Sequence, residues 1–201
     1  MQKIAKVLSF IFHPLFTPIA GTIIFFIITP KYTPPEIIRP IFLSILIISV
    51  FIPIVLLLLF KNLGWISSIY LDKVEERKIP IYAYIALNYI IILKVIPFNL
   101  YEELYYFLVG IVGALVACVI LVYFKFKASL HLMAISSLTT FIIGLAFHYE
   151  INITFAIATL IFLMGLIASA RMYLRTHNMQ EMIVGFIIGF IPQLITFNSW
   201  L

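Results

Sequence analysis

Charged residues are scarce in this sequence, and their scarcity excludes a water-soluble domain. Asp, Glu, Lys and Arg make up 10% of its 201 residues, whereas a soluble domain carries roughly 25%. Hydrophobic residues make up 64%, and the mean hydropathy is +1.19. Too few polar side chains are present to cover a surface in water. We therefore expect a protein whose solvent is largely lipid.

Cysteine and clustered metal ligands are also lacking. Cys118 is the single cysteine and lies in an apolar run, so it forms no intrachain disulfide and is expected to pack among apolar side chains. No Asp/Glu cluster or His/Cys set has metal-ligand spacing, so the sequence predicts no metal and no other cofactor. The net charge is +5, but the basic residues lie in short segments between apolar runs. That placement indicates membrane orientation and phosphate groups rather than a nucleic acid partner.

Long apolar segments are what the sequence does contain. A helix needs roughly 20 apolar residues to cross the bilayer, and seven segments are candidates: residues 4–29, 37–60, 81–97, 104–124, 129–148, 152–170 and 182–198. They are continuous, whereas the strands of a barrel would alternate polar and apolar residues. The third segment is the least secure, because it is short and holds Asn88 and Lys94. The sequence predicts an all-α, polytopic membrane bundle of about six to seven transmembrane helices, with residues 1–201 as one transmembrane domain.

The first apolar segment follows Lys3 and Lys6, as a secretory signal peptide would. It exceeds the roughly 7 to 15 residues of a signal h-region, and no small-residue cleavage site follows it. We therefore expect a retained membrane helix, in an integral protein of a bacterial inner (plasma) membrane.

Counting the crossings places three polar segments, residues 61–80, 125–129 and 171–181, on the face where the N-terminus begins. Ten basic residues belong to that face and three to the other: Lys3, Lys6, Lys61, Lys73, Arg77, Lys78, Lys125, Lys127, Arg171 and Arg175 against Lys31, Arg39 and Lys94. The positive-inside rule assigns the richer face to the cytoplasm. Any of these residues that bind substrate cannot be counted as evidence of membrane orientation, because their charge serves the site.

The first two polar segments each have a structural and a functional interpretation. Residues 72–80 are dense in charge directly before a helix, which is typical of a solvated loop with internal ion pairs. Ser129 and His131 lie in the first turn of a helix, where free N–H groups and the helix dipole favour an anion. Ser129 is equally explained as a helix cap, and a lone His at this place as structural.

The third polar segment is the most informative. If the helix that begins here includes His177, Glu181 stands one turn further along on the same face. A carboxylate in that place can hold one ring nitrogen and leave the other free as a nucleophile. The alternative is that Asn178 or Thr176 caps the helix, with Glu181 placed on its dipole.

Together the three segments supply the parts for phosphoryl transfer. Fixed cations stabilise the charge on a phosphoryl group, one imidazole attacks the phosphorus, and a second protonates the departing oxygen. His13 and His148 are left over: His13 precedes Pro14 in the first apolar segment, and His148 lies at the opposite turn with Glu150. We expect both to be structural.

The order and spacing of these residues resemble the type 2 phosphatidic acid phosphatase (lipid phosphate phosphatase) superfamily, over about residues 72–189. Its third motif, Ser-Arg-x5-His-x3-Asp, matches Ala170-Arg171, His177 and Glu181 in every spacing, with Ala for Ser and Glu for Asp. Its second motif, Pro-Ser-Gly-His, matches residues 128–131 at Ser129 and His131, with Leu130 in place of Gly. Its first motif, Lys-x6-Arg-Pro, aligned on Pro80, puts Asp72 and Ile79 where the cations belong. Lys73, Arg77 or Lys78 would have to act from shifted positions.

The resemblance implies a role for each of these side chains. His177 would form a phosphohistidine intermediate, His131 would be the general acid, and Glu181 would orient His177. Arg171, with Arg77 or Lys73 and with Lys78 as a further candidate, would hold the phosphoryl oxygens together with N–H groups near Ser129. The expected function is a metal-independent membrane phosphatase that hydrolyses a lipid phosphate or polyprenyl diphosphate among the membrane lipids.

Two other functions stay open. The altered first and second motifs suit a catalytically silent member of the fold that binds or moves phospholipid head groups. A channel or ion transporter is the weaker alternative, because the charges gather at one face rather than at mid-membrane. Separately, the spacing of Gly185 and Gly189 permits close helix contact, either inside the bundle or across a homodimer.

Overall fold

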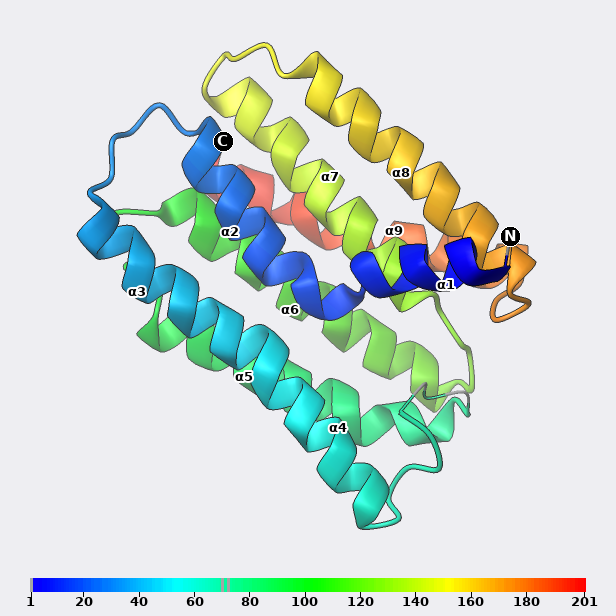
Figure 1. Cartoon of the computed structure of the whole chain (residues 1–201). Coiled ribbons are helices and arrows are strands. Elements are labelled where there is room, and N and C mark those ends of the chain that lie inside the picture. Colours follow the sequence, from blue (N-terminus) through cyan, green and yellow to red (C-terminus); the bar gives the residue numbers. More distant parts are fainter. Residues whose placement is uncertain (1, 70, 72) are drawn as a thin grey trace.

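The computed structural model describes residues 2–69, 71 and 73–201, and the described part of the chain contains helices and no strand. Asp72, which the family alignment places at the first motif, lies outside these residues. Figure 1 shows a bundle of helices that run side by side, which confirms the all-α prediction. The elements in order are α1 (Gln2–Ile11), η1 (Pro14–Phe16), α2 (Thr17–Ile28), α3 (Pro35–Leu46), η2 (Ile47–Phe51), α4 (Ile52–Asn62), η3 (Glu75–Arg77), α5 (Lys78–Lys94), α6 (Glu102–Tyr123), α7 (Leu130–His148), α8 (Thr154–Tyr173) and α9 (Met179–Trp200).

Six helical segments are long and apolar enough to cross a membrane: residues 2–28, 35–62, 102–123, 130–148, 154–173 and 179–200. The third predicted segment, residues 81–97, folds as the 17-residue helix α5, which is shorter than these six segments and packs against α6. Large apolar side chains point outward along the bundle, among them Ile27, Phe155 and Phe162, which are 76%, 87% and 66% exposed. An apolar exterior over helices of this length makes the chain an integral membrane protein.

Helix α7 forms the centre of the bundle. It packs against α2, α6, α8 and α9, and 78% of its membrane segment is buried, whereas only 11% of α8 is. Its buried hydroxyls bond to main-chain carbonyls one turn back, as Thr139 does to Ile135 and Thr140 to Ser136. Such internal hydrogen bonds allow polar side chains to lie in an apolar interior. The first residues of α7 carry the second polar segment, so the centre of the bundle also positions the site.

Proline divides the first apolar segment. His13 adopts an extended conformation directly before Pro14, because the proline ring disfavours helix at the preceding residue. Helix α1 therefore ends at Ile11, and in Figure 1 it lies across one end of the bundle at an angle to α2, where it packs on α8. A polar side chain and a helix end are thereby brought inside the bundle at the break.

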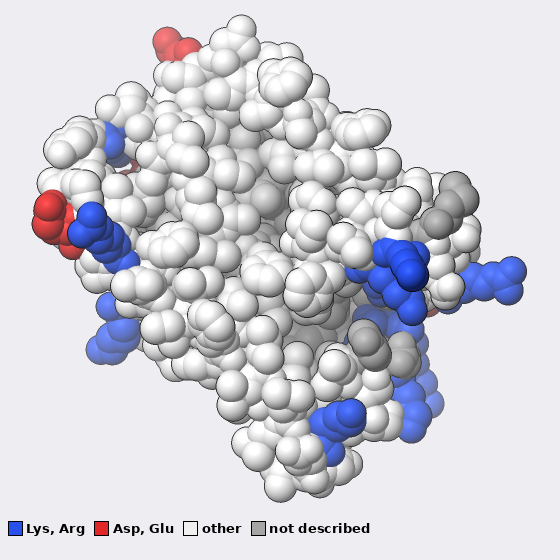
Figure 2. Space-filling view, viewed as in Figure 1, with Lys and Arg blue, Asp and Glu red and all other residues white. Residues whose placement is uncertain are grey.

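The N-terminus and the three polar segments share one end of the bundle, as the count of crossings predicts (Figure 1). Figure 2 shows most of the visible basic side chains over this end. The opposite end carries a second polar cluster centred on Glu103, which is 3% exposed. Its carboxylate accepts hydrogen bonds from Lys31 at 3.0 Å and from the hydroxyl of Tyr149, with Nε2 of His148 at 3.5 Å. This cluster fastens the α2–α3 and α7–α8 connections to α6.

Candidate functional site

His177, in the connection between α8 and α9, lies against Glu181 in the first turn of α9. Nδ1 of His177 lies 2.9 Å from Oε2 of Glu181. Because a carboxylate only accepts hydrogen bonds, Nδ1 carries the proton and Nε2 is left unprotonated in the neutral ring. This is the orientation predicted for a nucleophilic imidazole.

Asn178 begins α9 with a capping box, so both interpretations of this segment hold at once. Its side chain accepts a hydrogen bond from the N–H of Glu181 at 2.9 Å, and its own N–H donates to Glu181 Oε2 at 3.1 Å. The helix starts at Met179 and does not include His177. Glu181 nevertheless reaches back to the imidazole, because the residue before the cap lies over the first turn. Thr176 is no cap, since its hydroxyl donates to the carbonyl of Arg171 at 3.0 Å.

Burial sets the protonation state of His177, whose side chain is 1% exposed. Burial, followed by the positive charges of Arg171 and Arg77, lowers the pKa of His177 from 6.5 to about 4, although Glu181 acts in the opposite direction. The ring is therefore neutral at pH 7, and Nε2 keeps the lone pair that a nucleophile requires.

Arg77 joins the first polar segment to the second. It is 4% exposed, and its guanidinium donates to the carbonyl of Leu71 at 3.1 Å and to that of Ala128 at 3.0 Å. A buried arginine so close to the start of α7 holds a fixed positive charge beside the third segment as well, because its charge acts on His177. Arg77 is thus the residue of the first segment that the structure brings to the histidines.

Ser129 joins the second segment to the third. It is fully buried and caps α7, and its N–H donates to the carbonyl of Glu181 at 2.9 Å. The close approach depends on Gly185, where a Cβ would lie 2.5 Å from the carbonyl oxygen of Ser129. Because this N–H already has an acceptor, the anion site predicted near Ser129 would have to use other donors.

His131 faces helix α1. Its Nε2 lies 3.0 Å from the carbonyl oxygen of Ser9, so Nε2 carries the proton. His13 packs edge-on against it, with the ring centroids 5.6 Å apart, and its Nδ1 accepts from the N–H of Leu15 at 3.3 Å. The charge of Arg171 acts on all three imidazoles, those of His13, His131 and His177.

Sequence reasoning missed the contribution of the N-terminal segment. The expectation that His13 is structural stays a prediction, and the sequence gives no signal for Ser9; in the structure both contact His131. A signal was present for His13, because an ionisable residue inside an apolar segment is by default a candidate functional residue. The pairing with His131 depends on the angle between α1 and α2, which the sequence does not give.

Two predicted cations lie apart from the histidines. Lys73 pairs with Glu76 at 3.3 Å, and the carboxylate of Glu76 also accepts from Ser67. The ammonium of Lys78 lies over the ring of Tyr123, 4.3 Å from its centroid. The roles of Lys73 and Lys78 as phosphate ligands stay predictions, as do those of Arg77 and Arg171, whose charges act on His177.

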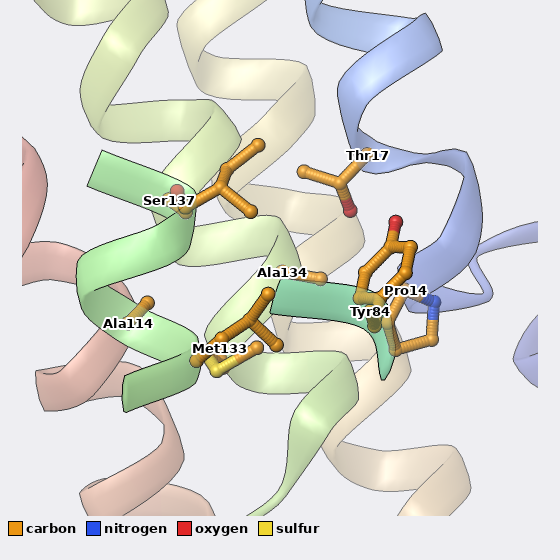
Figure 3. Close-up of a pocket in the computed structure, with 9 residues that line it drawn as sticks. Pro14, Thr17, Tyr84, Ala114, Met133, Ala134 and Ser137 are labelled. Carbon is orange, nitrogen blue, oxygen red and sulfur yellow. The ribbon is translucent and has the colours of Figure 1, made fainter. Parts of the chain in front are cut away.

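The space beside the site is small. A cavity of about 10 Å³ is lined by Pro14, the residue after His13, and by Thr17, Tyr84 and Met133 among others. Figure 3 shows the hydroxyls of Thr17 and Tyr84 on one side of it and Met133 on the other. A cavity of this size holds about one water molecule. It is too small for a phosphoryl group.

The assembled site comprises His177 with Glu181, His131 with His13, and the cations Arg77 and Arg171, all drawn from the same end of the bundle. Within residues 2–69, 71 and 73–201, no group of three or more His, Cys, Asp or Glu side chains is arranged to hold a metal ion. Comparison of the chain with family models, with curated proteins and with solved structures finds no match.

Proposed function

We propose that this chain is an integral membrane phosphatase that releases phosphate from a lipid phosphate or polyprenyl diphosphate, as the resemblance of its motifs implies. The observation that carries the proposal is the state of His177. Its Nδ1–H is held by Glu181, and its ring is buried and neutral beside two guanidinium groups. A neutral imidazole with one nitrogen held and the other free is suited to nucleophilic attack on phosphorus.

The reaction has two steps. Nε2 of His177 attacks the phosphorus, the bond from phosphorus to the lipid oxygen breaks, and that oxygen takes a proton from His131, which must enter this step as an imidazolium and leaves it as a neutral ring. Water then cleaves the phosphohistidine and returns a proton to His131, while Arg77 and Arg171 stabilise the phosphoryl oxygens. Because Nε2–H of His131 donates to the carbonyl of Ser9, donation from Nε2 to the lipid oxygen requires this hydrogen bond to break.

Replacement of His177 by Ala tests the proposal. Phosphate release is measured on phosphatidate, phosphatidylglycerophosphate and undecaprenyl diphosphate, and we expect His177→Ala to abolish it on every substrate that the wild type turns over. His148→Ala is the control, because it removes an imidazole at the opposite end of the bundle. Undiminished release by His177→Ala would refute the assignment.

A second candidate function is binding or movement of phospholipid head groups without hydrolysis. Two observations favour it: the N–H of Ser129 is already bonded to Glu181, and Leu130 stands where the family motif has glycine. Retention of lipid phosphate without turnover across the same panel would support this function. A phosphohistidine trapped with radiolabelled substrate would exclude it.

A further inference from the structure

A groove opens on the outer surface at the end of the bundle opposite the candidate site. It is about 380 Å³ in volume and lies between the start of α3 and the end of α5. Ile37, Pro40 and Ile41 line it from α3, and Val95 and Pro97 from the segment after α5. None of these residues belongs to the phosphatase site, so the groove needs an explanation of its own.

The short length of α5 accounts for the groove. Seventeen residues of α helix extend about 25 Å, less than the roughly 30 Å of the hydrocarbon layer. The helical segment from Pro35 to Asn62 has 28 residues and is correspondingly longer. Helix α5 packs against η2 and α4, so its end leaves the first turns of α3 partly uncovered.

Two side chains of opposite charge also line the groove. Glu36 lies in the first turn of α3, and Lys94 lies in the last turn of α5. Among residues 2–69, 71 and 73–201, neither takes part in an ion pair, and both are exposed. Opposite charges that face one groove without pairing complement a ligand that itself carries both signs of charge.

We propose that this groove binds one phospholipid with a zwitterionic phosphoethanolamine head group. Lys94 contacts the phosphate, Glu36 accepts hydrogen bonds from the ammonium, and an acyl chain follows the apolar lining along α3. A choline head group presents methyl groups to Glu36 and loses these hydrogen bonds. A glycerol head group leaves the charge of Glu36 unmatched beside an anionic lipid.

The test titrates the purified full chain in detergent with dioctanoyl phosphatidylethanolamine, phosphatidylcholine and phosphatidylglycerol, and counts bound lipid by native mass spectrometry. The ethanolamine lipid is expected to bind tightest. Glu36→Gln and Lys94→Gln should each weaken its binding by about tenfold, the effect of losing one charge-assisted hydrogen bond. Arg39→Gln is the matched control, because Arg39 is exposed on the same helix and does not line the groove.

Ser44→Phe provides a steric test that leaves the charges intact, since Ser44 also lines the groove. It should weaken binding of the same lipid while the melting temperature stays near that of the wild type. Free phosphoethanolamine should not compete, because it lacks the acyl chains that the apolar lining binds. Equal binding of the glycerol lipid, an effect of Arg39→Gln as large as that of Lys94→Gln, or full competition by free phosphoethanolamine would overturn the proposal.

Discussion

Glu181 contributes to two interactions that belong to different functions. Its Oε2 accepts from the N–H of Asn178, which caps α9, and from Nδ1 of His177, which orients the imidazole. One carboxylate therefore stabilises the helix and prepares the nucleophile. Substitutions of Asn178 and of Glu181, the two residues of the capping box, separate these two contributions.

Asn178→Ala should lower the free energy of unfolding by about 0.5–2 kcal/mol, the usual cost of losing a helix cap. It should leave phosphate release nearly unchanged, because the contact between Glu181 and His177 stays. Glu181→Ala should lower both, whereas Glu181→Gln retains the capping geometry and loses the charge that orients the ring. Thermal unfolding in detergent and phosphate release on the same samples distinguish the three variants. A loss of release in Asn178→Ala equal to that in Glu181→Ala would contradict the separation.

The lowered pKa of His177 predicts that the stability of the protein depends on pH. Its pKa falls from 6.5 to about 4 on folding, so between these values the unfolded chain binds more protons than the folded chain. The free energy of unfolding should therefore decrease as pH falls from 6.5 towards 4, and this residue should account for at most about 3 kcal/mol of that decrease.

Comparison with His177→Gln isolates that contribution from those of the other histidines. Melting temperatures at pH 7.5 and pH 5 should differ less for His177→Gln than for the wild type. If the two proteins lost the same melting temperature between pH 7.5 and pH 5, the lowered pKa of His177 would not contribute to the pH dependence of stability.

At the scale of elements, α7 and α9 are held together by close backbone contact. A Cβ at Gly189 would lie 2.1 Å from the carbonyl oxygen of Met133, and the one at Gly185 would meet Ser129. The contact that the Gly-x-x-x-Gly spacing permits is thus made inside one chain. A homodimer through Gly185 and Gly189 stays a prediction, and it is not needed to explain the spacing.

Gly189→Ala should destabilise the protein by roughly 1–3 kcal/mol, because backbone cannot move aside as a side-chain end can. Gly165→Ala in α8 is the control: nothing lies within 4 Å of its added Cβ, so the substitution should be neutral or stabilise by up to about 1 kcal/mol. Melting temperatures of the two variants give the comparison. Equal melting temperatures would contradict the close α7–α9 contact.

At the scale of the whole molecule, the bundle has two polar ends of different character. The end with His131 and His177 carries most of the basic residues, and the other is tied together by Glu103. The positive-inside rule then predicts that the candidate site lies on the cytoplasmic side. A lipid phosphate would reach the site from the inner leaflet.

Cysteine labelling tests this orientation. In a Cys118→Ser background, Tyr32→Cys lies at the Glu103 end and Lys61→Cys at the site end, both at exposed positions. An impermeant maleimide should label Tyr32→Cys in intact cells and Lys61→Cys only after the membrane is opened. The reverse pattern would place the site on the outer side.

The sequence by itself determined that this is a membrane bundle with its polar segments at one end. The length of an apolar segment and the number of crossings are read along the chain. Neither depends on how each helix is rotated about its axis. The pairing of His177 with Glu181 was also predictable, because both lie within one turn of a single helix start.

Only the tertiary structure decided which side chains from different elements meet. It brought His13 and the carbonyl of Ser9 to His131, buried Arg77 against Ala128, and left Lys73 and Lys78 on Glu76 and Tyr123. These contacts depend on the angle at a proline break and on the rotation of each helix about its axis. Packing between the helices sets both quantities, and residue spacing along the chain does not encode them.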